Sequence, residues 1–197
     1  MEHSRIEGGT VRRLWPSDLA AFREHLLRLD PQSRFDRFAM AVSDDFLRNY
    51  AQRCFGIDDV IFGFFVDGTM RGAGELRPVG LGVQSGSAEA AFSVEHGWRR
   101  QGIGTELMGR IVQAARNRRA ETLYMSCLAR NGAMQGLAKK FTADLEFDTD
   151  VLTGKLVART PRAAALWNEW IDDSSSFATA MLDLQTRMFS IRRDARR

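Results

Sequence analysis

The feature that most constrains the fold of this chain is a short strand that leads through a glycine turn into an amphipathic helix. Glu89–Val94 has the alternation and residue types of a strand. The turn Arg99-Arg100-Gln101-Gly102-Ile103-Gly104-Thr105 follows, and apolar residues then recur at helical spacing from Ile103 to Ala115. The sequence therefore predicts a helix whose N-terminus lies directly beyond the end of a strand.

Strand and helix patterns alternate on both sides of this unit. Val60–Val66 is too apolar for a half-exposed strand, and Asp67-Gly68 predicts a hairpin turn that makes the next strand its antiparallel partner. The other expected elements are a strand over Thr10–Leu14, a helix over Leu19–Leu29, a helix from the N-cap Ser43 to Cys54, strands over Met70–Pro78 and Thr122–Leu128, a helix from Asn131 to about Lys140, and strands over Thr142–Phe147 and Val151–Val157.

Composition excludes several classes of protein. With 44% apolar and 27% charged residues among its 197, the chain has the composition of a globular protein that needs no disulfide or structural metal to hold its fold. No apolar run approaches the ~20 residues of a membrane span. Cys54 and Cys127 stand 73 positions apart with no second cysteine or histidine at ligand spacing, which indicates neither a disulfide framework nor a zinc site, so a reducing cytoplasm is expected. The net charge of +3 is small for a nucleic-acid-binding surface. His3, His25 and His96 are scattered, so neither a metal nor histidine catalysis is expected.

The glycine turn has the chemistry of a phosphate site. A helix N-terminus offers unpaired N–H groups and a partial positive charge, and Gly102 and Gly104 allow a pyrophosphate to approach them closely. Arg99 and Arg100 add charge, and Thr105 adds a hydroxyl group. The alternative is an ordinary strand-to-helix turn with solvated arginines. The sequence lacks the Gly-Lys-Ser/Thr of a P-loop, and Leu107 replaces the third glycine of a dinucleotide fingerprint.

This segment resembles the acetyl-CoA signature of the GNAT superfamily of N-acetyltransferases, Arg/Gln-x-x-Gly-x-Gly/Ala, which Arg99–Gly104 matches in full. Ala88–Val94 resembles the fourth strand of the family, and Asn131–Lys140 its following helix. The resemblance implies an α/β (α+β) acyl-CoA N-acyltransferase fold with a central, mostly antiparallel mixed sheet flanked by helices. Within the family, Leu29–Phe38 and the Asn131 segment look most like the catalytic domain of bacterial protein-lysine acetyltransferases.

The resemblance also implies site residues. Acetyl transfer requires a neutral amine, so a base must accept its proton; Glu89 is the candidate, with Glu75 as its rival. The backbone of Val94 or a neighbour would bind the oxyanion. Acetyl-CoA, without a metal, would bind to Phe92, Ser93, Val94, Arg99, Arg100, Gln101, Gly102, Ile103, Gly104, Thr105 and Asn131.

Ala138 occupies the position at which many family members carry a tyrosine that protonates the departing thiolate. A thiol with a pKa near ~8.5 is a tolerable leaving group without such an acid. Ser126 and Cys127, at the end of the neighbouring strand, are weaker substitutes, because a cysteine on an apolar strand is more often core filling. The expected function is acetyl transfer to a primary amine of a protein or small molecule. The alternatives are a non-catalytic acyl-CoA sensor and an interaction module.

A helical extension over 161–197 is expected to follow an acetyltransferase domain over 1–160. One apolar stripe runs from Ala163 to Ile171, and a second runs from Phe177 to Ile191 at spacings of 4, 3, 4 and 3 residues. Both apolar stripes are expected to pack against another apolar surface, away from solvent. They pack either on the sheet of the same chain or, for the second stripe, against another subunit in a homodimer.

Overall fold

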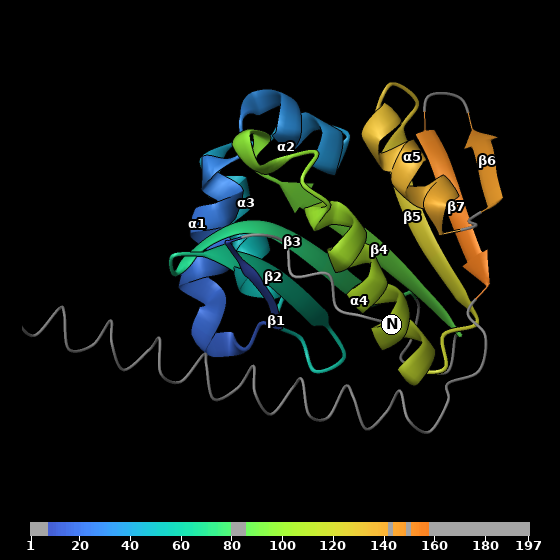
Figure 1. The fold of residues 1–197 in the computed structure, drawn as a ribbon, viewed down its shortest axis with the longest axis horizontal. Coiled ribbons are helices and arrows are strands. Elements are labelled where there is room, and N and C mark those ends of the chain that lie inside the picture. Colours follow the sequence, from blue (N-terminus) through green and yellow to red (C-terminus); the bar gives the residue numbers. More distant parts are fainter. Residues whose placement is uncertain (1–7, 80–85, 142–143, 149–150, 158–197) are drawn as a thin grey trace, which may run out of the picture.

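The computed structural model describes residues 8–79, 86–141, 144–148 and 151–157 of the chain (Figure 1). The expected C-terminal helices over 161–197 lie outside the described residues. The division at residue 160 and the homodimer therefore stay predictions. Within the described ranges, no helix is long and apolar enough to cross a membrane.

A seven-stranded sheet in the order β1-β2-β3-β4-β5-β7-β6 forms the centre of the described structure. Neighbouring strands are antiparallel, except that β4 and β5 run parallel. This is the mostly antiparallel mixed sheet that the sequence predicts, and the fold class is confirmed. The strands are β1 (Thr10–Arg13), β2 (Val60–Val66), β3 (Thr69–Pro78), β4 (Ser87–Val94), β5 (Thr122–Leu128), β6 (Asp144–Asp148) and β7 (Val151–Val157).

Helices cover both faces of this sheet (Figure 1). Ser43 and Asn131 cap their helices as expected, because their side chains accept hydrogen bonds from the N–H groups of Phe46 and Met134, at 3.2 and 3.1 Å. The helices of the described part are α1 (Leu19–Arg28), α2 (Pro31–Phe38), α3 (Asp44–Arg53), α4 (Ile103–Asn117) and α5 (Gly132–Lys140), with 3-10 turns at Pro16–Asp18 and His96–Trp98.

The helix α2 is the one described α-helix that the sequence analysis does not predict. Its eight residues are mostly polar, and Phe35 and Phe38 are its only large apolar side chains, a pattern too short to indicate a helix by itself. Its start is nevertheless signalled by Asp30, whose side chain accepts from the Ser33 N–H at 2.9 Å, and by Pro31 at the first helical position. The helix brings Asp36 and Arg37 over the sheet.

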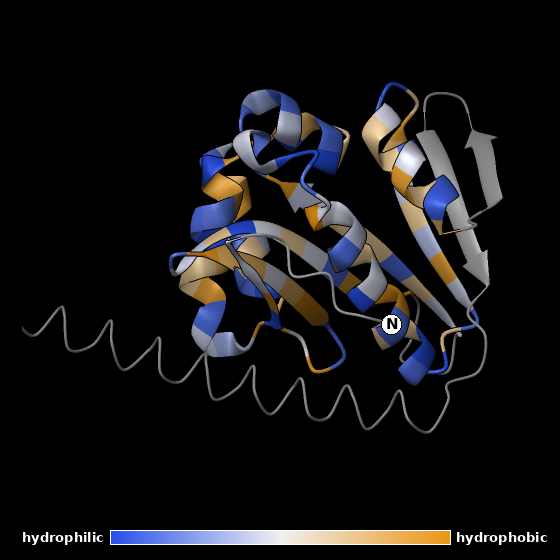
Figure 2. Ribbon diagram, in the orientation of Figure 1, coloured by the Kyte–Doolittle hydropathy of each residue, from blue (hydrophilic) through white to orange (hydrophobic). Residues whose placement is uncertain are grey.

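The sheet separates two apolar cores. One core joins the sheet to α4 and α5, and the other joins it to α1 and α3. The strand β2 contributes Phe62 and Phe64 to the first core and Ile61 and Phe65 to the second, which explains its unbroken apolar run. In Figure 2 it is accordingly among the most hydrophobic strands.

The strands β4 and β5 pair along only part of their length. Ser87–Glu89 pairs with Thr122–Tyr124, whereas β4 continues to pair with β3 as far as Val94, and β5 with β7 as far as Leu128. The two strands therefore diverge beyond Glu89, toward the end of the sheet where α2 and α5 lie (Figure 1). This divergence positions the site described below.

Gly74 of β3 allows α4 to pack closely on the sheet, so Gly74→Val should destabilise the fold. A Cβ at Gly74 would lie 3.2 Å from Ile111 Cγ1 of α4 and 3.2 Å from Phe92 Cε1. Overpacking of this kind should lower the free energy of unfolding by about 1–3 kcal/mol, measured by urea denaturation. Gly109→Val on α4 is the matched control, because a Cβ there meets nothing within 4 Å. Equal stabilities of the two variants would contradict this account of the packing.

Candidate active site

Two adjoining cavities lie at the opening between β4 and β5. The larger, of about 830 Å³, is bordered by the C-terminal end of β4, the first turn of α4 and the helix α5. The smaller, of about 220 Å³, extends toward Glu89 and Ser126. Both cavities are lined by Asp36, Arg37, Phe92, Asn131 and Met134, so they form one continuous groove.

The glycine turn supplies one end of the larger cavity. Gly102 caps α4 with a φ of +86°, a left-handed conformation that favours glycine, and Arg100 also has a positive φ of 65°. No side chain caps this helix, and its first intrahelical bond runs from the N–H of Glu106 to the carbonyl of Gly102. The N–H groups of the first turn, including that of Gly104, are therefore free to bind an anion at the positive end of the helix.

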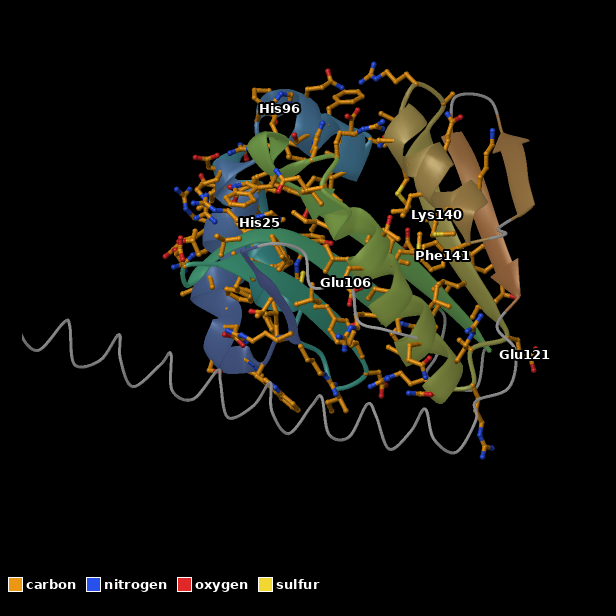
Figure 3. The ribbon with its side chains drawn as sticks, in the orientation of Figure 1. His25, His96, Glu106, Glu121, Lys140 and Phe141 are labelled. Carbon is orange, nitrogen blue, oxygen red and sulfur yellow. The ribbon has the colours of Figure 1, made fainter. Side chains whose placement is uncertain are left out.

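Basic side chains lie around this turn. Arg100 lines the larger cavity with an exposed side chain, and Lys140 of α5 borders the same cavity (Figure 3). Arg99 is held more firmly: its Nε donates to the Val94 carbonyl at 3.2 Å, and its Nη2 donates to Ser33 Oγ at 2.7 Å. Arg99 thus joins the glycine turn to α2.

The other residues predicted for the turn differ in their placement. Ile103 is buried in the core below the larger cavity, and Thr105 lines that cavity one residue beyond Gly104. The side-chain amide of Gln101 instead donates to the carbonyl of Gly97 at 3.3 Å, on the exposed side of the turn. The turn therefore offers an anion its backbone, two arginines and one hydroxyl group.

The edge of β4 presents unpaired backbone groups to the opening. The Glu95 N–H donates to the Arg71 carbonyl of β3 at 3.0 Å, and the Ser87 carbonyl accepts from the Val79 N–H, so odd-numbered residues of β4 bond to β3. By the alternation of a strand, the N–H and C=O groups of Phe92 and Val94 point away from β3. At this level β5 has already diverged. The N–H groups of Phe92 and Val94 and the carbonyl of Phe92 can therefore pair with an extended, amide-bearing ligand. The Val94 carbonyl already accepts from Arg99 Nε, and the backbone of Ser93 is turned toward β3.

Glu89 is exposed on β4 and lines the smaller cavity. Among the described residues, its carboxylate has no hydrogen-bond or ion-pair partner. A solvated carboxylate beside a cavity can accept a proton directly or through a water molecule.

Glu75, the rival base, is 1% exposed and fully engaged. It forms ion pairs with Arg37 at 2.8 Å and Arg77 at 3.0 Å, and it accepts from the Tyr50 hydroxyl at 2.8 Å. Burial opposes its ionisation, but the charges of Arg37 and Arg77 outweigh burial and lower the pKa of Glu75. A buried carboxylate that is already neutralised by two arginines is a poorer proton acceptor than Glu89.

Asn131 begins α5 beside both cavities, where its side chain caps the helix. Ala138, one turn from the end of α5, is 2% exposed in the core and offers no acidic proton. Ser126 is exposed in the smaller cavity, and burial raises the pKa of the neighbouring Cys127. Neither side chain has a hydrogen-bond partner among the described residues that would activate it.

The sequence analysis does not identify the contribution of α2 to the site. Asp36 and Arg37 line both cavities, yet they lie more than fifty positions before Glu89 in the chain. The signal for α2 itself was present at Asp30-Pro31. The position of the helix over the opening depends on tertiary contacts, such as the ion pair of Arg37 with Glu75.

Comparisons with solved structures support the fold. The GNAT domain of S. lividans PAT superposes with a TM-score of 0.67 at 18% identity, over 76% of this chain and 90% of that chain. The ribosomal-protein-S18-alanine N-acetyltransferase from Escherichia coli gives 0.60 at 18% identity, over 79% of this chain and 97% of the other. YncA from Salmonella typhimurium, solved with its cofactor acetyl-CoA, gives 0.61 at 14% identity, with coverages of 79% and 97%. At sequence identities this low, the structural matches establish a shared fold and nothing further.

No curated protein matches this chain. The sequence model of the acetyltransferase (GNAT) family matches residues 21–142, which is more than half of the chain and includes the β4 edge, the glycine turn and all of α5. The chain therefore belongs to the GNAT family of acetyl-CoA-dependent N-acetyltransferases.

Proposed function

We propose that this protein transfers the acetyl group of acetyl-CoA to a primary amine by direct attack. The observation that carries the proposal is the open edge of β4, which runs from the free N-terminus of α4 to the exposed carboxylate of Glu89. The first turn of α4, with Arg100 and Lys140, suits the pyrophosphate. The free N–H groups of Phe92 and Val94 and the free carbonyl of Phe92 suit the pantetheine amides.

The acceptor amine would enter through the smaller cavity. This cavity carries the unpartnered carboxylate of Glu89, whereas Asp36 lies 3.9 Å from Arg130 and the charge of Arg37 is countered by Glu75. The Glu89 carboxylate favours a cationic acceptor, and an amine is a cation before it loses its proton. The similarity to the S. lividans PAT domain favours a protein lysine as the acceptor, and the similarity to the ribosomal-protein acetyltransferase favours a protein α-amine as the acceptor.

This arrangement provides a base for the amine and a backbone donor for the oxyanion. Glu89 takes the proton of the amine, directly or through water. The N–H of Phe92 or Val94 stabilises the oxyanion that forms when the amine attacks the thioester carbonyl. The thiolate leaves without an acid at Ala138. Cys54 and Cys127 are both free thiols, which accords with action in the reducing cytoplasm.

A thiol-release assay with a panel of acceptors tests this function. The full chain should release CoA thiol from acetyl-CoA with at least one of four acceptor classes: a lysine-bearing protein, a polyamine, an amino acid or an aminoglycoside antibiotic. Binding of acetyl-CoA without turnover on the whole panel would favour the sensor instead. A chain that does not bind acetyl-CoA at all would favour the interaction module.

Gly104→Val should weaken acetyl-CoA binding at least tenfold, or ~1.4 kcal/mol, because the side chain would project into the space for the pyrophosphate. A Cβ at Gly104 meets only Leu137 Cδ2, at 3.7 Å, so the variant should fold. Titration calorimetry measures the affinity, and Gly109→Val, later on the same helix, is the matched control. Unchanged affinity in folded Gly104→Val would remove the phosphate-binding role of the turn.

Glu89→Gln should lower turnover by about 10²-fold while leaving the affinity for acetyl-CoA nearly intact, because the amide cannot accept the proton of the amine. The variant should also change the shape of the pH–rate profile. Glu121→Gln is the control, since Glu121 is exposed at the opposite end of β5 (Figure 3). If Glu89→Gln turns over at the wild-type rate at every pH, the general base is Glu75 or the reaction uses no base from the protein.

A further inference from the structure

Three side chains that the proposed mechanism does not use form a hydrogen-bonded chain beneath the end of β4. The Oγ of Ser93 lies 2.9 Å from Nε2 of His25, and Nδ1 of His25 lies 3.1 Å from Oε1 of Glu95. His25, which projects from α1 (Figure 3), is fully buried, whereas Ser93 and Glu95 are 8% and 9% exposed.

The protonation states follow from the surroundings of this chain. Glu95 also accepts from Arg28 Nε at 3.0 Å and from Arg71 Nη1 at 2.9 Å. Burial disfavours its charged form, but the hydrogen bonds from His25 and Arg71 outweigh burial and lower the pKa of Glu95 to about 2. Burial lowers the pKa of His25, so the imidazole is neutral at pH 7.

One tautomer satisfies both hydrogen bonds of the imidazole. The Glu95 carboxylate can only accept, so Nδ1–H of His25 donates to it, and Nε2 accepts the proton of the Ser93 hydroxyl. A serine that donates to a neutral imidazole, which in turn donates to a carboxylate, is the arrangement that activates serine nucleophiles. It is recognised by geometry and roles rather than by sequence position.

Ser93 is also correctly placed relative to the groups that would bind the thioester. It lines the larger cavity and lies between Phe92 and Val94, whose N–H groups face the opening. A carbonyl held by N–H groups at a strand edge lies near the plane of the sheet, so a nucleophile must approach it from one face of the sheet. The bond to His25 shows that Ser93 Oγ projects toward the α1 side, as Glu89 does by strand alternation.

We propose that Ser93 accepts the acetyl group from acetyl-CoA when no amine occupies the smaller cavity. The Ser93 Oγ–carbon bond forms as the carbon–sulfur bond of the thioester breaks, and the hydroxyl proton passes to His25 Nε2 and then to the departing thiolate. The products are an acetyl ester on Ser93 and the free CoA thiol. The proposal rests on the proposed function, since it requires acetyl-CoA in the larger cavity.

In the Ser93 reaction, His25 provides the proton donor that is missing at Ala138. His25 becomes an imidazolium when it takes the serine proton, and Glu95 stabilises that charge at 3.1 Å. His25 is fully buried and lines neither cavity, so its proton reaches the thiolate through water in the larger cavity. Water can later attack the ester, which releases acetate and restores the Ser93 hydroxyl.

The test is an acceptor-free reaction of the full chain with acetyl-CoA in a buffer that contains no amine. We expect at least one thiol released for each chain, and a tryptic peptide in which Ser93 carries an acetyl group that hydroxylamine removes. Ser93→Ala should lower this release about tenfold or more, whereas Ser93→Cys should retain it, since a thiol can also accept the acetyl group. Calorimetry and circular dichroism confirm that each variant folds and binds acetyl-CoA.

The outcomes separate this inference from the proposed function. Acetyl-CoA binding without thiol release or a modified Ser93 overturns the inference alone and leaves the network a structural link between α1 and β4. Acetylation of Cys127 or of lysines in place of Ser93 overturns it as well. Failure to bind acetyl-CoA overturns the proposed function, and the inference with it.

Discussion

The structure depends on the interrupted pairing between β4 and β5. Inside a sheet, each strand normally satisfies its backbone groups on both edges, and an unpaired buried N–H or C=O is costly. Here the parallel ladder ends at Glu89, while β4 continues to Val94 against β3 alone. The N–H groups of the first turn of α4 also lack partners. Both sets of unsatisfied groups border one cavity, so an extended ligand that carries amides and phosphates can satisfy them together.

Environment, rather than residue type, distinguishes the carboxylates near this opening. Glu75 and Glu89 project from neighbouring strands on the same side of the sheet, yet Glu75 is enclosed by Arg37, Arg77 and Tyr50. Its charge holds α2 over the opening, because Arg37 belongs to that helix. Glu89 has no such partner among the described residues and remains open to the smaller cavity. Glu75 therefore has a structural part in the site, and Glu89 remains available to accept a proton.

Local signals in the sequence predict most of the described elements, but not their tertiary relations. The Asp67-Gly68 turn, the cap residues Ser43 and Asn131, and the unbroken apolar run of β2 each act through near neighbours, and the structure confirms them. The divergence of β4 from β5 has no local cause. His25 illustrates the limit: it looks isolated in the sequence, yet its partner Ser93 lies 68 positions away and meets it only when α1 packs against the end of β4.

The strand β4 places Glu89 and Ser93, the side chains proposed to act on or as nucleophiles, on the same face of the sheet. In the proposed function the backbone of even-numbered residues would hold the thioester. Odd-numbered residues direct their side chains toward the α1–α3 layer, where Glu89 and Ser93 both lie. An amine beside Glu89 and the hydroxyl of Ser93 would therefore approach the same carbonyl from the same side. Only one of them can occupy the position of attack at a time. On these two proposals, occupancy of the smaller cavity by an acceptor would determine which nucleophile receives the acetyl group, and the two reactions would share one set of oxyanion donors.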